Sequence, residues 1–152
     1  MPRPGHRLDV MLVARPVDRE VSDVVATRTV ELLKSRVKAD VRGVRVDRRD
    51  RPWLFANQQG GFHVRCPVDG MSVVVPFSRA WARYRDGKGE RAMRCLCGEQ
   101  HLLEALDFLP MAAFGRVAVT LLDVSSARVV SGHEAAIEAV FGPFDVVARR
   151  VG

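Results

Sequence analysis

The chain has 152 residues, which is enough for one ordinary domain or for a small domain with an insert, and its 47% of hydrophobic residues can fill a core. A net charge of +6 favours acidic partners over basic ones. Arginine, however, outnumbers lysine 21 to 3, a usage that a GC-rich genome also produces. Three cysteines exclude a complete disulfide framework. Because no stretch approaches the roughly 20 apolar residues of a membrane span and no secretory signal is visible, we expect a cytoplasmic protein with no membrane partner.

The start of the chain predicts a β-α-β unit. Residues 8–14 (LDVMLVA) are almost continuously apolar, which is typical of a buried strand. Residues 17–38 predict a helix with acidic side chains near its start and basic ones near its end, as the helix dipole favours. Its apolar stripe is predicted to contain Val21, Val24, Val25, Leu32 and Leu33. Residues 41–47 (VRGVRVD) alternate apolar and polar side chains and predict a second strand.

The middle of the chain, residues 52–110, is too long for a loop and must have structure of its own. Turns are predicted at 57–61 and 86–89, where glycines cluster. Residues 62–66 and 71–75 predict two strands of a hairpin. Residues 77–85 and 98–109 predict helices.

The end of the chain repeats the first plan. Residues 115–124 predict a strand, and Ser131 with Glu134 matches a capping box that opens a helix over 133–141. Gly142 followed by Pro143 is a stop signal, and residues 144–151 predict the last strand. Two β-α-β units predict an α+β fold, a ferredoxin-like sandwich with four strands in one sheet and both helices on one face. The predicted domains are a discontinuous one, 1–51 with 111–152, and an insert at 52–110.

Two cysteine-containing turns lie inside this insert. Residues 66–70 read Cys-Pro-Val-Asp-Gly and residues 95–98 read Cys-Leu-Cys-Gly. Both resemble the knuckles of zinc ribbons, usually Cys-Pro-x-Cys-Gly, and the resemblance covers about residues 62–101. Two departures stand out: Asp69 occupies the place of a second cysteine, and Cys95 precedes Cys97 by two positions instead of three.

The resemblance implies a zinc ion between the two turns. Its ligands would be Cys66, Cys95 and Cys97, with Asp69 as the fourth, His101 as the next choice and His63 as a third. Such a closed site would be structural, because catalysis needs an open coordination position. The alternative is a degenerate ribbon that keeps its fold without metal and buries its cysteines as small hydrophobic residues. A ribbon followed by residues 106–119 (LDFLPMAAFGRVAV) is also loosely similar to certain bacterial proteins, which implies no function.

A basic segment, residues 76–94, carries six basic and two acidic residues. Aromatic side chains beside cations can bind nucleic acid. The candidates for that role are Arg79, Trp81, Arg83, Arg85, Lys88 and Arg91. The aromatic residues, however, recur with the spacing of a helix that packs on a core. We therefore expect Trp81 to be buried, with Arg79 and Arg83 exposed. Residues 45–53 (RVDRRDRPW) are interpreted as a solvated strand end and turn.

Catalytic signatures are weak. Asp123, Ser125, Ser126 and His133 supply the residue types of a hydrolytic triad, but no strained nucleophile turn surrounds either serine. We expect a non-enzymatic interaction or assembly module that presents its insert to a protein partner. The alternatives are a nucleic-acid-binding protein and, second, a metal-assisted hydrolase.

Overall fold

The computed structural model describes residues 7–37, 43–57 and 62–151. The chain divides into two compact units, residues 1–59 with 111–152, and residues 60–110. Together they form a mixed α+β structure with three α-helices in the described residues. Within these residues no helix has both the length and the apolar character needed to cross a membrane.

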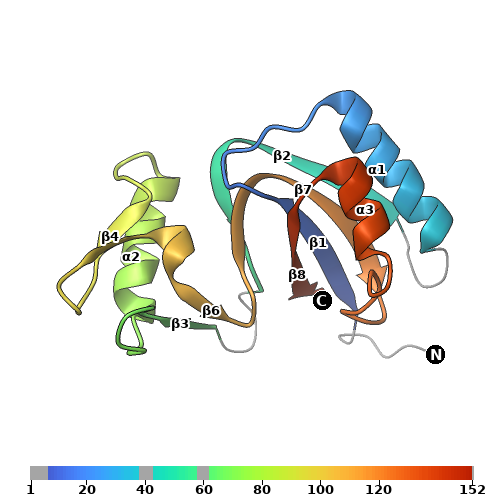
Figure 1. The fold of residues 1–152 in the computed structure, drawn as a ribbon. Coiled ribbons are helices and arrows are strands. Elements are labelled where there is room, and N and C mark those ends of the chain that lie inside the picture. Colours follow the sequence, from blue (N-terminus) through green and yellow to red (C-terminus); the bar gives the residue numbers. More distant parts are fainter. Residues whose placement is uncertain (1–6, 38–42, 58–61, 152) are drawn as a thin grey trace. The chain divides into compact units, whose positions relative to one another are not determined.

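The first unit is built on one antiparallel sheet with the strand order β2-β7-β1-β8. Its strands are β1 (Leu8–Ala14), β2 (Gly43–Phe55), β7 (Ala113–Val124) and β8 (Phe144–Arg150). The prediction that four strands share one sheet is therefore confirmed. Helices α1 (Asp23–Arg36) and α3 (Glu134–Phe141) lie on the same face of this sheet, as Figure 1 shows.

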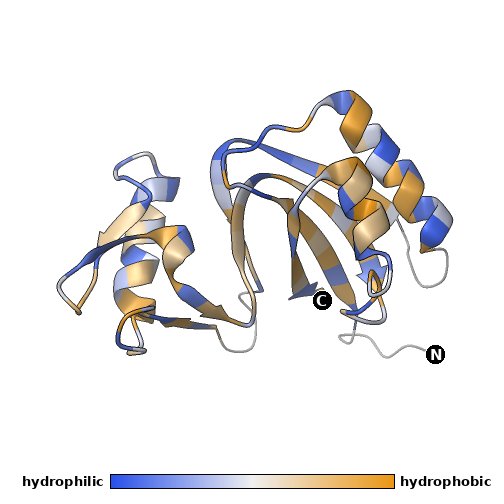
Figure 2. Ribbon diagram, viewed as in Figure 1, coloured by the Kyte–Doolittle hydropathy of each residue, from blue (hydrophilic) through white to orange (hydrophobic). Residues whose placement is uncertain are grey.

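The main core lies between this face and the two helices. Val10 and Leu12 of β1 are fully buried there, against Leu33 of α1 and Ile137 of α3. The central strands β1 and β7 are mostly hydrophobic, whereas α1 alternates hydrophobic and hydrophilic residues around its axis (Figure 2). This difference follows from position: a central strand is buried, while a surface helix buries one stripe.

The opposite face of the sheet is also buried near its centre. Strands β2 and β7 continue past a register shift between Arg48 and Trp53, and Phe55 then joins a second core cluster with Met11 and Val13. Glycine is required at one point of this bend: a Cβ atom on Gly115 would lie 2.6 Å from Val13 Cγ1. Strand β2 is thus longer than the predicted 41–47 and reaches into the range predicted for the insert.

Helix α1 starts later than predicted, and helix α3 has a different N-cap from the predicted one. Helix α1 starts at Asp23 because Ser22 caps it: the Val25 N–H donates to Ser22 Oγ at 3.2 Å. The predicted stripe is shifted, since Val24 is 59% exposed. The residues that α1 buries are Ala26, Thr29 and Leu33.

Helix α3 begins at Glu134 with His133 as its N-cap, so the predicted cap at Ser131 is wrong. The Glu134 carboxylate instead accepts a hydrogen bond from the Gly132 N–H at 2.8 Å. The predicted stop is confirmed, because Gly142 ends the helix with φ of +88°, a backbone conformation that glycine adopts without a Cβ penalty.

The second unit contains short elements. They are β3 (His63–Arg65), α2 (Val74–Arg85), β4 (Ala92–Arg94), β5 (Gln100–Leu102), the 3-10 helix η1 (Leu103–Ala105) and β6 (Asp107–Leu109). Strand β3 pairs with β6, and β4 pairs with β5. The predicted helix over 98–109 is therefore wrong: residues 100–102 and 107–109 pair with two other strands, and only the 3-10 helix at 103–105 lies between them.

The predicted hairpin strand over 71–75 is reduced to a single bridge between Arg65 and Ser72 before α2 begins. The predicted turn at 86–89 is present, with Gly87 at φ of +73°. The predicted turn at 57–61 lies mostly outside the described residues.

Helix α2 supplies the aromatic core of the second unit. Phe77, Trp81 and Tyr84 are buried, and the Phe77 ring meets the Phe108 ring edge-on with centroids 5.2 Å apart. Arg79 and Arg83 are exposed on the same helix. The prediction of a core-packing aromatic stripe is confirmed.

Candidate metal centre

The first cysteine lies at the end of strand β3, where the chain turns at residues 66–70. The Cys66 N–H donates to the Met71 carbonyl and the Gly70 N–H donates to the Cys66 carbonyl, both at 2.9 Å. Gly70 has φ of +73°, which closes the turn. The Val68 N–H points at the Cys66 sulfur at 3.4 Å. The sequence Cys-Pro-Val-Asp-Gly thus folds into a tight turn with an amide directed at the thiol.

The second turn, residues 95–98, joins β4 to β5 and is one residue shorter. The Cys95 N–H donates to the Glu99 carbonyl at 2.8 Å, and the Gly98 N–H donates to the Cys95 carbonyl at 3.0 Å. Gly98 has φ of +95°. This hairpin places two thiols in the centre, Cys95 from its start and Cys97 from its tip.

The fourth group comes from strand β5. His101 pairs with Met93 of β4 across the hairpin, so the strand pairing brings the ring close to the turn that follows β4. Its Nε2 lies 3.4 Å from the Cys97 sulfur and 3.8 Å from the Cys66 sulfur. The histidine therefore bridges the two turns.

The ligand atoms of Cys66, Cys95, Cys97 and His101 all lie within 4.8 Å of one another. In a tetrahedral zinc site with ordinary bond lengths, sulfur and nitrogen ligands are about 3.6 Å apart. The two measured sulfur–nitrogen distances fall on either side of that value. Cys66 and Cys95 are buried, while Cys97 and His101 are half-buried. These four side chains could bind a metal ion.

Two predicted ligands do not join this group. Asp69, predicted as the fourth ligand, is exposed, and its Oδ1 accepts a hydrogen bond from the Met71 N–H at 2.9 Å. His63 is exposed on β3. The first turn therefore contributes only Cys66 to the group, and His101 of β5 takes the fourth place.

The pKa values of Cys66 and Cys95 are shifted in opposite directions. Burial raises the pKa of the Cys66 thiol to about 11, against the lowering effect of the backbone amides of Asp69 and Val68. The Cys97 N–H hydrogen bond is the main cause that lowers the pKa of Cys95. A bound cation would favour the thiolate at every position, because metal binding and thiol deprotonation are coupled.

The residues of the nucleic-acid interpretation do not form a stacking surface. Trp81 is buried, whereas Arg79, Arg83, Arg85 and Lys88 are exposed. Arg91 forms an ion pair with Glu104 at 3.0 Å, and this contact raises its pKa. Cations without exposed aromatic rings can attract phosphate but supply no base stacking.

The residue types of a hydrolytic triad have other contacts. Asp123 pairs with Arg7 at 2.9 Å. Ser126 Oγ accepts a hydrogen bond from the Arg128 N–H at 3.1 Å, closing a local turn. His133 caps α3, and its Nδ1 is buried without a hydrogen-bond partner among the described residues.

Comparison of the chain with protein-family models, with curated proteins and with solved structures gave no match. The case for a metal centre therefore rests on the geometry of the four side chains. The sequence gives His101 only as the next choice after Asp69, because residues 98–109 predict a helix, whereas the pairing of β5 with β4 brings His101 to the thiols.

Proposed function

We propose that Cys66, Cys95, Cys97 and His101 hold a zinc ion and that the second unit is a zinc-ribbon-like module. The carrying observation is the convergence of three sulfur atoms and one imidazole nitrogen within 4.8 Å. Thiolates and imidazole are the usual ligands of structural zinc, and softer donors disfavour magnesium and calcium.

The ion would stabilise structure and would not act as a catalyst. Four protein ligands complete a tetrahedral site and leave no position for water or substrate. The second unit has about 50 residues, a size at which a metal commonly supplements a small core. Its strands β3, β4, β5 and β6 have only three residues each, so a metal between its turns would contribute much of its folding free energy.

The first unit supplies the scaffold, which we propose is a ferredoxin-like sandwich. Two β-α-β units and the strand order β2-β7-β1-β8 support this assignment. The zinc-ribbon-like module is inserted in the chain between β2 and β7. The protein would then be a non-enzymatic interaction or assembly module, working in the cytoplasm, where thiols stay reduced.

A protein partner is the proposed ligand of the zinc-ribbon-like module. Both turns of the metal centre carry an exposed apolar side chain, Val68 at 62% and Leu96 at 77%. The metal would hold these two turns in place, and exposed apolar groups favour contact with another protein.

Elemental analysis of protein purified without added metal tests the proposal. We expect nearly one zinc per chain. Capture of partners from the native host should also weaken when a chelator removes the ion. Protein without zinc that retains the fold of the second unit would contradict the proposal.

A further inference from the structure

A groove runs along helix α1 beside strand β2 in the first unit. One cavity of about 450 Å³ has an apolar part, formed by Ala26 and Val30 of α1 and Val46 of β2, and is also lined by charged side chains of α1, Asp23, Glu31 and Lys34. A second cavity of about 360 Å³ lies at the start of α1 and is lined by Val117 and Arg116 of β7. Arg48 lines both cavities, so they adjoin. We call the pair the α1–β2 groove.

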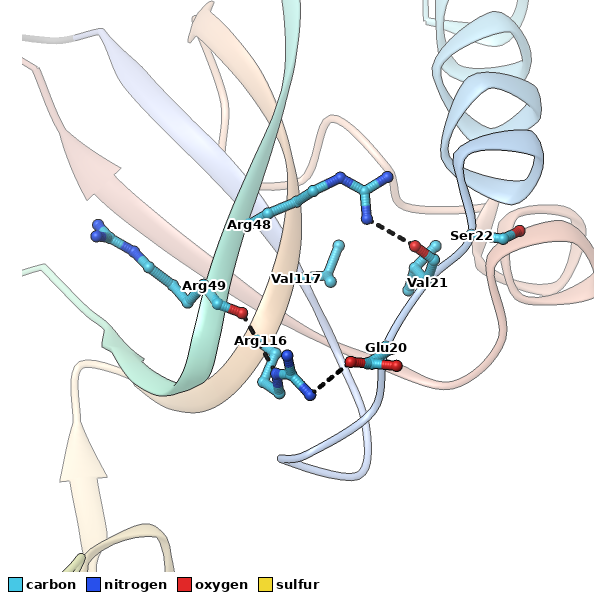
Figure 3. A pocket seen from close by; sticks show the side chains of 7 residues that line it. All are labelled: Glu20, Val21, Ser22, Arg48, Arg49, Arg116 and Val117. Carbon is cyan, nitrogen blue, oxygen red and sulfur yellow. Dashed lines mark hydrogen bonds and ion pairs between the residues drawn. The ribbon is translucent and has the colours of Figure 1, made fainter.

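Figure 3 shows the second cavity from close by. The Arg48 side chain reaches across it to the chain before α1, where it donates to the Val21 carbonyl at 2.6 Å. Arg116 reaches the Glu20 carboxylate at 2.9 Å. The Arg49 side chain points away from the cavity and contacts Trp53, with the guanidinium 4.8 Å from the ring centre. Arg48 and Arg116 are thus two cations of the groove. Its lining also includes Lys34 and the acidic residues Glu20, Asp23 and Glu31.

The acidic partners of these arginines are held loosely. Glu20 is 77% exposed and Asp23, which Arg48 contacts at 2.8 Å, is 97% exposed. Arg116 is only 23% exposed. Ion pairs with such exposed carboxylates contribute about 0–1 kcal/mol, so a carboxylate from another molecule could replace them at low cost.

Strand β2 forms one edge of the sheet, because β7 is its only neighbouring strand in the described residues. Along residues 43–48 it is paired to β7 without a register shift. An edge strand turns every second N–H and C=O group away from its neighbour, and these groups can pair with an added strand. Within the described residues, the groove thus combines an edge strand of the sheet, apolar side chains and two arginines that are paired with exposed carboxylates.

We propose that the α1–β2 groove binds an extended segment of a partner protein, which pairs with β2 along residues 43–48. An acidic side chain of this segment contacts Arg48, and an apolar side chain lies over Ala26, Val30 and Val46. Adding a strand to an edge beside a helix obtains affinity from backbone hydrogen bonds and specificity from alternate side chains. This site is separate from the metal centre and does not depend on its metal.

The register of β2 determines the sequence pattern of the partner. Val46 and Arg48 are two residues apart and both line the groove, as alternate residues of a strand share a face. The added strand therefore presents its acidic and apolar side chains at the same spacing, as acidic–any–apolar or the reverse. Polar residues suit the intervening positions, which face the other side.

The probe is a short acetylated and amidated peptide, Thr-Val-Thr-Glu-Thr-Val-Thr. Its valines flank the glutamate on one face, so either strand direction brings the glutamate to Arg48 and a valine to Val46. Two matched peptides accompany it: one with glutamine in place of glutamate, and one with N-methylated amides on the edge that would pair with β2. Binding to the full-length protein is measured by fluorescence polarisation and by amide chemical shifts.

We expect saturable binding with shift changes confined to residues 23–34, 43–48 and 116–117. N-methylation should abolish binding, because it removes the backbone hydrogen bonds to β2. Glutamine should weaken binding about tenfold, or about 1.4 kcal/mol, because it loses the charge-assisted hydrogen bond to Arg48. Arg48→Glu should weaken it by at least the same factor, while Arg128→Glu, an exposed arginine outside the groove, should not. Binding should persist after chelation.

Several results would overturn the inference. These are no saturable binding in the millimolar range, binding that survives N-methylation, or shifts that map to the second unit. Acetate alone giving the same shifts would mean that the groove takes only a simple anion. The peptide comparisons use the unaltered protein, so they decide the matter even if Arg48→Glu disturbs the start of α1.

Discussion

Removing the imidazole of His101 should weaken zinc binding far more than changing His63 or Asp69, the other two side chains that the sequence offers as the fourth ligand. His101 Nε2 lies at ligand distance from two sulfur atoms, at 3.4 and 3.8 Å. Loss of a side chain that only supports a ligand typically weakens metal binding 10–100-fold. Loss of a direct ligand should exceed that range, so we expect His101→Ala to weaken binding at least about 100-fold, or about 2.7 kcal/mol.

The measurement is a competition titration of the full-length protein against a chromophoric chelator of known zinc affinity. His63→Ala is the matched control, because it removes an exposed histidine of the same unit. Asp69→Asn tests whether the carboxylate is a ligand; in the structure its Oδ1 accepts a hydrogen bond from the Met71 N–H. Both should keep zinc affinity within a few fold of the unaltered protein.

Two results would refute this reasoning. If His101→Ala and His63→Ala bind zinc equally well, the imidazole is not a ligand. If Asp69→Asn causes the large loss instead, the first turn supplies two ligands and the arrangement of this centre is different from the one described.

Two further predictions concern the bend of the sheet and the protons of the thiols. Gly115→Ala should destabilise the protein by about 1–3 kcal/mol, because its Cβ would lie 2.6 Å from Val13 Cγ1; thermal unfolding should show a lower melting temperature than for Gly43→Ala, where a Cβ meets ordinary contacts. Zinc affinity should fall as the pH is lowered, by about tenfold per pH unit from Cys66 alone. The pKa of Cys66 is about 11, so at neutral pH this thiol holds a proton that the metal must displace. A zinc affinity that does not change with pH would contradict this prediction.

The three thiols of the candidate metal centre could be predicted from the sequence because the turn signals are local. Cys66 with Gly70, and Cys95 with Gly98, lie within a few residues of each other, and glycine at positive φ closes each turn. The fourth ligand could not be chosen in the same way. His101 joins the thiols only because β5 pairs with β4, and the local apolar pattern of residues 98–109 favoured a helix instead.

The α1–β2 groove shows the same limit. The sequence of residues 45–53 favours a solvated strand end and turn, whereas in the structure the whole range belongs to β2. Nothing near these residues in the sequence indicates a cavity. The groove exists because β2 is an edge strand and because α1, about twenty residues earlier in the chain, packs beside it.

The sequence by itself determined the principal strands and helices of the first unit, the α+β class and the two cysteine turns. These features depend on periodicity and on turn residues within short windows. Only the tertiary structure decided that β2 and β7 bend over the second face, that residues 100–102 and 107–109 form strands, and that His101 joins the three cysteines in the candidate metal centre. Each of these outcomes depends on backbone pairing or close packing between segments that are apart in the chain, and short-range patterns do not specify which partner a strand will meet.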